Sequence, residues 1–173
     1  MPPTDAASEA PLLRMRGIRK SFPGVKALKG VDLSLHAGEV LALLGENGAG
    51  KSTLIKILGG AHQPDKGTIE IDGQPASVAT PQASQAAGIG IIYQEFNLIP
   101  HLSARENIFL GQEPGCTSFI PRASEEARAR ALFERIGVEV PINAECNSLT
   151  VAQQQIVEIA KTLSQDARII VMD

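Results

Sequence analysis

Residues 45–52 read GENGAGKS and fit the pattern G-x-x-x-x-G-K-[ST] at every fixed position. In this pattern, glycines let backbone N–H groups close around phosphate oxygens, and the helix that follows points its positive end at them. A buried strand must precede the pattern and a helix must follow it. The apolar run at 40–44 predicts a strand buried on both faces of a parallel sheet, and residues 53–58 predict a helix that ends at Gly59. The sequence therefore predicts an α/β fold with a nucleotide-phosphate site.

Two side chains of this loop have a specific expected role. Lys51 is expected to reach the β- and γ-phosphates of a nucleotide, and the Ser52 hydroxyl is expected to ligate Mg²⁺. The predicted phosphate-binding residues are Gly45, Glu46, Asn47, Gly48, Ala49, Gly50, Lys51, Ser52 and Thr53. The alternative, a glycine-rich turn beside a surface lysine, is disfavoured because chance produces this pattern in well under ~1% of chains of this length.

Composition excludes several other classes of protein. The chain has 16 basic and 19 acidic residues and a net charge of −3, whereas a nucleic-acid-binding domain is expected to have a pI above about 9. No apolar run approaches the roughly 18 residues of a membrane-spanning helix. The N-terminal sequence MPPTDAASEAPLL lacks the basic and apolar segments of a secretory signal. Cys116 and Cys146 match no metal or redox spacing. We expect a soluble intracellular protein with unpaired thiols and no nucleic-acid partner.

Apolar periodicity predicts strands in the first half of the chain and helices in the second. Strands are expected through residues 13–22, 31–35, 68–71, 89–93 and 169–172. Thr80 followed by Pro81 predicts the start of a short helix, and the capping box of Ser103 and Glu106 predicts another through Leu110. Residues 124–136 predict a third helix, and a fourth is indicated by the apolar stripe of Ile156, Ile159, Ala160 and Leu163.

These elements suggest an arrangement of three parts after a mobile tail at residues 1–11. Residues 12–96 are expected to form a core with an antiparallel β portion, and residues 97–165 a helical insert. Residues 166–173 then return to the core as its last strand. The fold class expected is α/β, a P-loop NTPase core interrupted by helices.

Four motifs at these positions resemble the ATP-binding cassette (ABC) family. Phe22 stands where such cassettes place an aromatic ring that stacks on adenine, and Gln94 matches the Q-loop glutamine, which senses Mg²⁺ and the γ-phosphate. Residues 149–153, LTVAQ, stand at the position of the family signature, usually LSGGQ. Residues 168–173, RIIVMD, match the Walker B strand, whose terminal Asp173 helps to hold Mg²⁺. The resemblance implies Lys51, Gln94 and Asp173 as catalytic residues, and Ser52, Gln94 and Asp173 as metal ligands.

The signature differs from the family pattern at two positions. Thr150 keeps a hydroxyl, but Val151 and Ala152 replace glycines, and their Cβ atoms restrict positive φ. Thr150 and Gln153 also form a capping box, so the segment is expected to start a helix. A helix N-terminus offers N–H groups to phosphate, and the resemblance implies that Thr150, Ala152 and Gln153 contact the nucleotide of a partner cassette.

The finer resemblance is to the first cassette of bacterial importers for ribose, galactose, xylose or arabinose, and it covers residues 12–173. It implies ATP and Mg²⁺ as ligands and a second cassette, fused or dimeric, as the partner across the nucleotides. It also implies membrane permease subunits and, indirectly, a periplasmic sugar-binding protein. The expected location is the cytoplasmic face of the bacterial inner membrane.

The sequence stops at Asp173, before the water-polarising glutamate and the switch histidine of the resembled family. We therefore expect this stretch alone to bind Mg²⁺-ATP and to hydrolyse it very slowly. Two alternatives are a truncated ATP-binding module that does not hydrolyse ATP, and another P-loop NTPase. A GTPase is disfavoured because no N-K-x-D segment occurs, and a kinase because acidic neighbours offset the arginines between 122 and 135.

Overall fold

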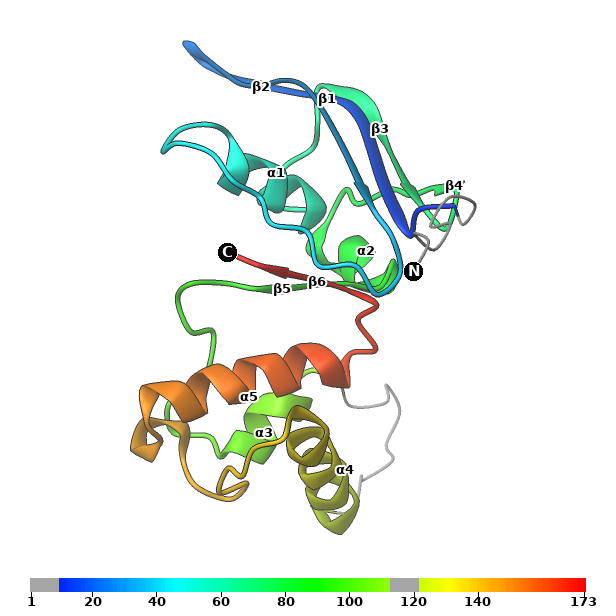
Figure 1. The fold of residues 1–173 in the computed structure, drawn as a ribbon. Coiled ribbons are helices and arrows are strands. Elements are labelled where there is room, and N and C mark those ends of the chain that lie inside the picture. The colour runs from blue at the N-terminus through cyan, green and yellow to red at the C-terminus, as the bar shows by residue number, and fades with distance from the viewer. Residues whose placement is uncertain (1–9, 113–121) are drawn as a thin grey trace, which may run out of the picture. The chain divides into compact units, whose positions relative to one another are not determined.

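The computed structural model describes residues 10–112 and 122–173 (Figure 1). Its contacts divide the chain into two units, one ending at Ile89 and the other spanning Gly90–Asp173. The expected mobile tail lies outside the described residues except for residues 10 and 11, and Cys116 also lies outside them. Cys146 is a buried free thiol.

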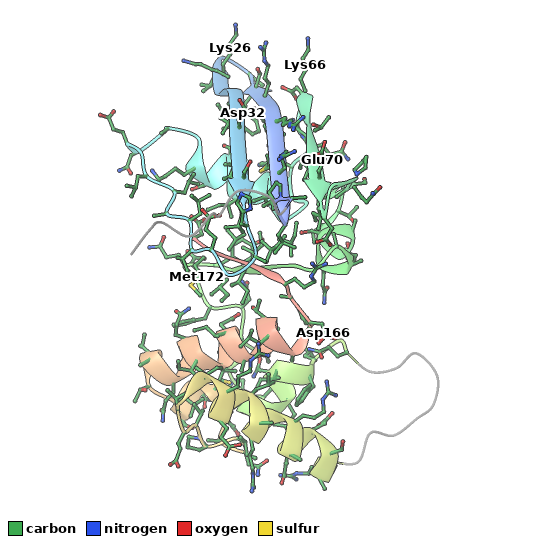
Figure 2. All side chains as sticks on the ribbon, turned by 45° about the vertical axis from the view of Figure 1, so that its right-hand side comes forward. Lys26, Asp32, Lys66, Glu70, Asp166 and Met172 are labelled. Atoms are coloured by element: carbon green, nitrogen blue, oxygen red, sulfur yellow. The ribbon has the colours of Figure 1, made fainter. Side chains whose placement is uncertain are left out.

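The first unit contains a four-stranded sheet in the order β2-β1-β3-β4. Strands β1 (Leu13–Phe22) and β2 (Val25–Leu35) form a hairpin, and β3 (Lys66–Ile71) pairs with the other edge of β1. The short β4 (Gln74–Pro75) completes the sheet, and all pairs are antiparallel. This confirms the expected antiparallel β portion. Charged side chains project from β2 and β3, among them Lys26, Asp32, Lys66 and Glu70 (Figure 2).

Two helices accompany this sheet in the first unit. Helix α1 (Lys51–Leu58) ends at Gly59, as predicted. Helix α2 (Pro81–Ala86) begins at Thr80, whose side chain accepts a hydrogen bond from the Ala83 N–H. Ser84 on α2 is buried, and its hydroxyl donates to the carbonyl of Leu58 over 2.5 Å, which ties the two helices together.

The prediction of a buried strand at residues 40–44 was wrong. The segment has no strand, and Val40 and Leu44 are 97% and 89% exposed. The physical reason is that an apolar run becomes a buried parallel strand only when neighbouring strands bond its backbone and other layers cover its faces. In the described part of the chain no strand pairs with these residues.

The second unit combines two strands with the predicted helices. Strands β5 (Ile89–Ile92) and β6 (Ile169–Met172) pair and run in the same direction (Figure 1). Between them in sequence lie α3 (Ala104–Phe109), α4 (Arg122–Ile136), the 3₁₀ turn η1 (Cys146–Ser148) and α5 (Val151–Ser164). The chain therefore has the mixed α/β architecture expected from its sequence.

Helix α5 buries the predicted stripe only in part: Ala160 belongs to that stripe and is buried, and Ile156 packs partly buried against the core. Val157 and Ala160 are fully buried in the core of this unit, whereas Ile159 and Leu163 are only half-buried. Glu158 and Thr162 are buried instead. Both α3 and α4 pack against α5, so its covered surface is set by two neighbours rather than by its apolar residues alone.

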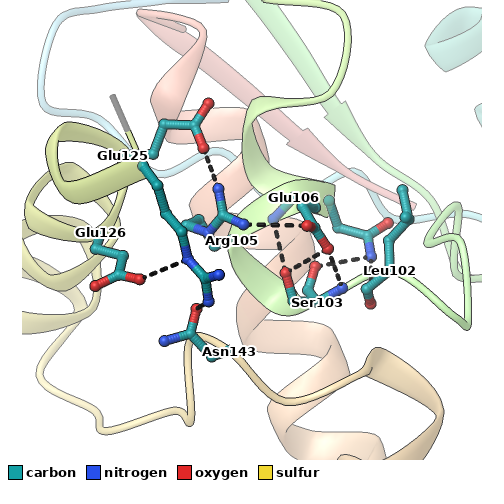
Figure 3. Close-up of polar contacts among 9 residues, drawn as sticks. Leu102, Ser103, Arg105, Glu106, Glu125, Glu126 and Asn143 are labelled. Atoms are coloured by element: carbon teal, nitrogen blue, oxygen red, sulfur yellow. Dashed lines mark hydrogen bonds and ion pairs between the residues drawn. The ribbon is translucent and has the colours of Figure 1, made fainter. Parts of the chain in front are cut away.

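A polar network joins α3 to α4 (Figure 3). The buried guanidinium of Arg105 forms ion pairs with Glu125 and, at 3.0 Å, with Glu106. Glu106 also completes the predicted capping box with Ser103, whose hydroxyl and main-chain N–H both donate to its carboxylate. The hydrogen bond from the Ser103 hydroxyl is the main cause that lowers the pKa of Glu106.

Candidate nucleotide-binding site

The phosphate loop has the backbone conformation that its glycines permit. Gly48 and Gly50 have φ values of +86° and +93°, a region that other residues rarely adopt. The Ala49 N–H donates to the Glu46 carbonyl over 3.1 Å and closes the turn. Helix α1 then begins at Lys51 without a side-chain cap, so its first N–H groups, which have no partner within the helix, face the loop end. An N-terminus of this kind binds phosphate.

Lys51 places a cation inside this loop. Its ammonium donates to the carbonyls of Gly45 and Glu46 over 2.6 and 3.0 Å. The positive charge is therefore held where the loop and the helix N-terminus both favour an anion. The N–H donors at the start of α1 and the positive charge of Lys51 both suit the triphosphate of a nucleotide.

Close packing on β2 holds the loop against the sheet. A Cβ on Gly50 would lie 2.5 Å from the Ala27 carbonyl oxygen and 2.7 Å from Leu28 Cδ2. A Cβ on Gly48 would meet nothing within 4 Å. Gly50 is thus required for space as well as for its φ, whereas Gly48 is required for φ alone.

Phe22, the predicted adenine-stacking residue, ends β1 with 36% of its surface exposed. The imidazole of His62 packs edge to face with it at 5.3 Å between ring centroids, and the Lys20 ammonium lies 5.7 Å from the ring centroid. Asp65 accepts hydrogen bonds from Lys20 and from the Ser21 N–H over 2.9 and 2.7 Å, and the bond from Lys20 is the largest cause that lowers its pKa. Because these bonds fix the two residues before Phe22, they hold the aromatic ring in place.

Sequence reasoning missed His62 and Asp65 as parts of this site. Asp65 lies 44 residues after Ser21, so no local pattern connects them.

Gln94 and Asp173 lie at the same edge of the two-stranded sheet in the second unit. The Asp173 N–H donates to the Ile92 carbonyl over 3.0 Å, and Gln94 follows Ile92 by two residues. Both strands end at this edge (Figure 1). Amide and carboxylate oxygens suit Mg²⁺, which usually takes the rest of its ligands from water and phosphate. No group of three or more metal-binding His, Cys, Asp or Glu side chains occurs in the described ranges.

The signature segment forms the predicted capping box at the start of α5. The Thr150 hydroxyl accepts from the Gln153 N–H over 3.3 Å, and the Gln153 side chain accepts from the Thr150 N–H over 3.0 Å. Ala152 is exposed. The capping function is therefore confirmed, and the contact of these residues with a nucleotide stays a prediction.

The predicted site residues form two groups, one in each unit. Phe22 and residues 45–53 belong to the first unit, and Gln94, Asp173 and the signature residues to the second. Among the helices of residues 10–112 and 122–173, none has the length and apolar character needed to cross a bilayer.

Comparison with known proteins identifies the family. The family model described as "ABC transporter" matches residues 28–173. The ribose import ATP-binding protein RbsA 2 of Burkholderia cenocepacia is 55% identical over 163 residues, which are 94% of this chain and 32% of that protein. RbsA 1 of Streptomyces avermitilis is 54% identical over 162 residues, covering 94% of this chain and 31% of that protein. The chain thus spans about a third of the length of these curated relatives.

Solved structures agree with this assignment. The ADP conformation of MJ1267, an ATP-binding cassette of an ABC transporter, superposes with a TM-score of 0.82 and 28% identity over 95% of this chain and 68% of that one. A dimeric post-hydrolysis state of the cassette MJ0796, bound to ADP and Pi, gives a TM-score of 0.74 and 29% identity over 93% and 73% of the two chains. With its phosphate loop and its mixed α/β fold, the chain belongs to the ABC transporter family and has the fold of its ATP-binding cassettes.

Proposed function

We propose that this chain is the ATP-binding part of a sugar-importer subunit that couples ATP binding and hydrolysis to carbohydrate uptake through a membrane permease. The observation that carries ATP binding is the phosphate loop, with Lys51 held over the uncapped start of α1. The assignment to sugar import is supported by relatives named ribose import ATP-binding proteins, which are 50–55% identical over 94% of this chain.

The residues of the first unit bind the nucleotide in this proposal. The N–H groups of residues 48–53 and the Lys51 ammonium contact the phosphates. Phe22 stacks on adenine, since its exposed ring is held in place by Asp65 through Lys20 and Ser21.

Ser52, Gln94 and Asp173 would hold Mg²⁺ together with phosphate oxygens, and the ion would supply positive charge beside the phosphoryl group. Gln94 also positions groups around the γ-phosphate. Thr150, Ala152 and Gln153 present the N-terminus of α5 to the nucleotide of a second cassette, fused or dimeric.

ATP binding closes the two cassettes, and hydrolysis with product release opens them again. The helices of the second unit pass this motion to permease subunits at the cytoplasmic face of the bacterial inner membrane. A periplasmic binding protein delivers the sugar, and nucleic acid has no part in the cycle.

Nucleotide binding is tested by urea unfolding with and without Mg²⁺-ATP. At 100 times its dissociation constant, ATP is expected to add about 2.7 kcal/mol to the free energy of unfolding. Lys51→Ala removes this gain. Lys56→Ala, the same change at an exposed position of the same helix, keeps it. An equal gain in Lys51→Ala contradicts the proposed phosphate site, and a larger gain with GTP contradicts ATP as the nucleotide.

Sugar import is tested with the full-length subunit assembled with permease and binding protein in vesicles. Uptake of ribose, galactose, xylose or arabinose is expected to require ATP and to stop in Lys51→Ala. ATP hydrolysis without uptake of any of the four sugars contradicts this part of the proposal.

A further inference from the structure

Two side chains of helix α5 form hydrogen bonds with the backbone of Asn97, one with its N–H and one with its carbonyl. The Asn97 N–H donates to Glu158 Oε1 over 2.6 Å, and the Lys161 ammonium donates to the Asn97 carbonyl over 3.2 Å. Glu158 and Lys161 are three residues apart and therefore share one side of α5. Asn97 lies three residues beyond Gln94.

The contact between Glu158 and Asn97 lies in a largely buried position. Glu158 is 6% exposed, and its carboxylate accepts a hydrogen bond from the Asn97 N–H. A hydrogen bond from an amide to a buried carboxylate is stronger than one between neutral groups. Release of Asn97 would remove a hydrogen bond from a buried carboxylate, which is costly.

The other end of the Gln94 segment also rests on α5. Gly90, in β5, passes so close to Thr162 that a Cβ at position 90 would overlap the threonine side chain. Thr162 itself is buried, and its hydroxyl donates to the Glu158 carbonyl over 3.0 Å. The residues on both sides of segment 91–96, Gly90 and Asn97, therefore contact the same helix, α5.

Beyond Asn97, the chain is bonded to the residues that lead into α5. The Asn147 N–H donates to the Pro100 carbonyl and the Cys146 N–H to the Leu102 carbonyl, each over 3.0 Å. The fully buried Asn107 bonds both polar backbone groups of Ile99 over 2.7 and 3.0 Å. The segment after Gln94 and the segment before Thr150 are therefore joined along several residues.

We propose that Glu158 and Lys161 are positioning residues that transmit a displacement of the Gln94 segment to the N-terminus of α5. This inference rests on the proposed function, because bound nucleotide causes the displacement. Glu158 and Lys161 lie outside the recognised motifs, and in this proposal they couple the Gln94 segment to Thr150 and Gln153.

Amide hydrogen exchange of the full chain, with and without Mg²⁺-ATP, tests the coupling. In the wild type we expect ATP to change exchange both at residues 93–97 and at residues 150–154. In Glu158→Ala the Asn97 amide exchanges about tenfold faster or more, since a bond to a charged group is lost. Residues 93–97 of this variant still respond to ATP, and residues 150–154 do not.

Two further variants separate positioning from folding. Glu158→Gln keeps an acceptor for the Asn97 N–H and is expected to restore most of the response at 150–154. Lys161→Met keeps the aliphatic stem but loses the donor to the Asn97 carbonyl, so it is expected to reduce the response to ATP at 150–154. If Glu158→Ala fails to fold, the Lys161→Met variant decides the test. Glu134→Ala, the same change at an exposed position of α4, leaves the response unchanged.

A wild-type response at 150–154 that persists in Glu158→Ala, or in Lys161→Met if that alanine variant does not fold, overturns the inference while leaving the proposed function intact. An ATP response at 93–97 alone in the wild type overturns it as well. No response to ATP anywhere in the wild type refutes the proposed function together with the inference.

Discussion

Gly50 and Gly48 allow the two demands on the phosphate loop to be measured separately. Both have positive φ, at +93° and +86°, but only Gly50 lacks room for a Cβ. In Gly48→Ala, the loss is the conformational strain alone, about 1–2 kcal/mol. In Gly50→Ala, the new Cβ meets the Ala27 carbonyl at 2.5 Å and Leu28 Cδ2 at 2.7 Å, and this overpacking costs roughly 1–3 kcal/mol more.

The assay is urea unfolding of the full chain for the wild type and both variants, first without nucleotide. The free energy of unfolding of Gly50→Ala is expected to fall below that of Gly48→Ala by about 1–3 kcal/mol, with unchanged slopes against urea concentration. Because the Ala27 carbonyl belongs to the backbone of β2, the loop has to move to relieve the contact. Gly50→Ala should therefore also lose the stabilisation by Mg²⁺-ATP. Equal losses of stability in the two variants would refute the argument that Gly50 is required for space.

Three other substitutions test the helix connections. Ser84→Ala leaves the buried Leu58 carbonyl without its donor and should lower the free energy of unfolding by about 1–3 kcal/mol, whereas retained stability in denaturant would show that the bond is replaceable. Thr150→Ala removes the cap of α5 and should cost about 1 kcal/mol in thermal unfolding, with Thr150→Ser close to wild type; equal melting of both variants would argue against capping. The folded-state pKa of Glu106 lies below its ordinary value of 4.5, so its carboxylate stabilises the fold above that pH and this contribution is lost as pH falls through the folded pKa. The stability difference between wild type and Glu106→Gln should accordingly shrink below about pH 4.5, and a difference independent of pH would count against it.

Local patterns predicted the parts of the molecule whose cause is local. The phosphate loop, the cap at Thr80 and both capping boxes each depend on residues within a few positions of one another, and each has the expected geometry. The Pro81 start of α2 is of the same kind. At the three caps the backbone needs only its neighbours in sequence to satisfy N–H groups at the start of a helix.

Contacts between distant residues could not be predicted in this way. The run at 40–44 has the composition of a buried strand, but burial depends on partners that composition does not specify. Asp65 reaches Ser21 across 44 residues and Glu158 reaches Asn97 across 61, and no periodicity indicates either pair. Glu158 lies outside the predicted apolar stripe of α5, and its burial, which creates the need for a donor, is visible only in the structure.

In the proposed nucleotide site, the two carbonyl bonds of Lys51 would affect how fast nucleotide enters and leaves. A phosphate competes with Gly45 and Glu46 for one ammonium, so the apparent affinity is the intrinsic one reduced by the fraction of molecules in which the lysine is released. If release costs about 1.4 kcal/mol, only about one molecule in ten is competent and the apparent dissociation constant is about tenfold weaker. In the proposed cycle these carbonyls would bond the lysine again as product departs, and this internal competitor would speed the exchange of nucleotide.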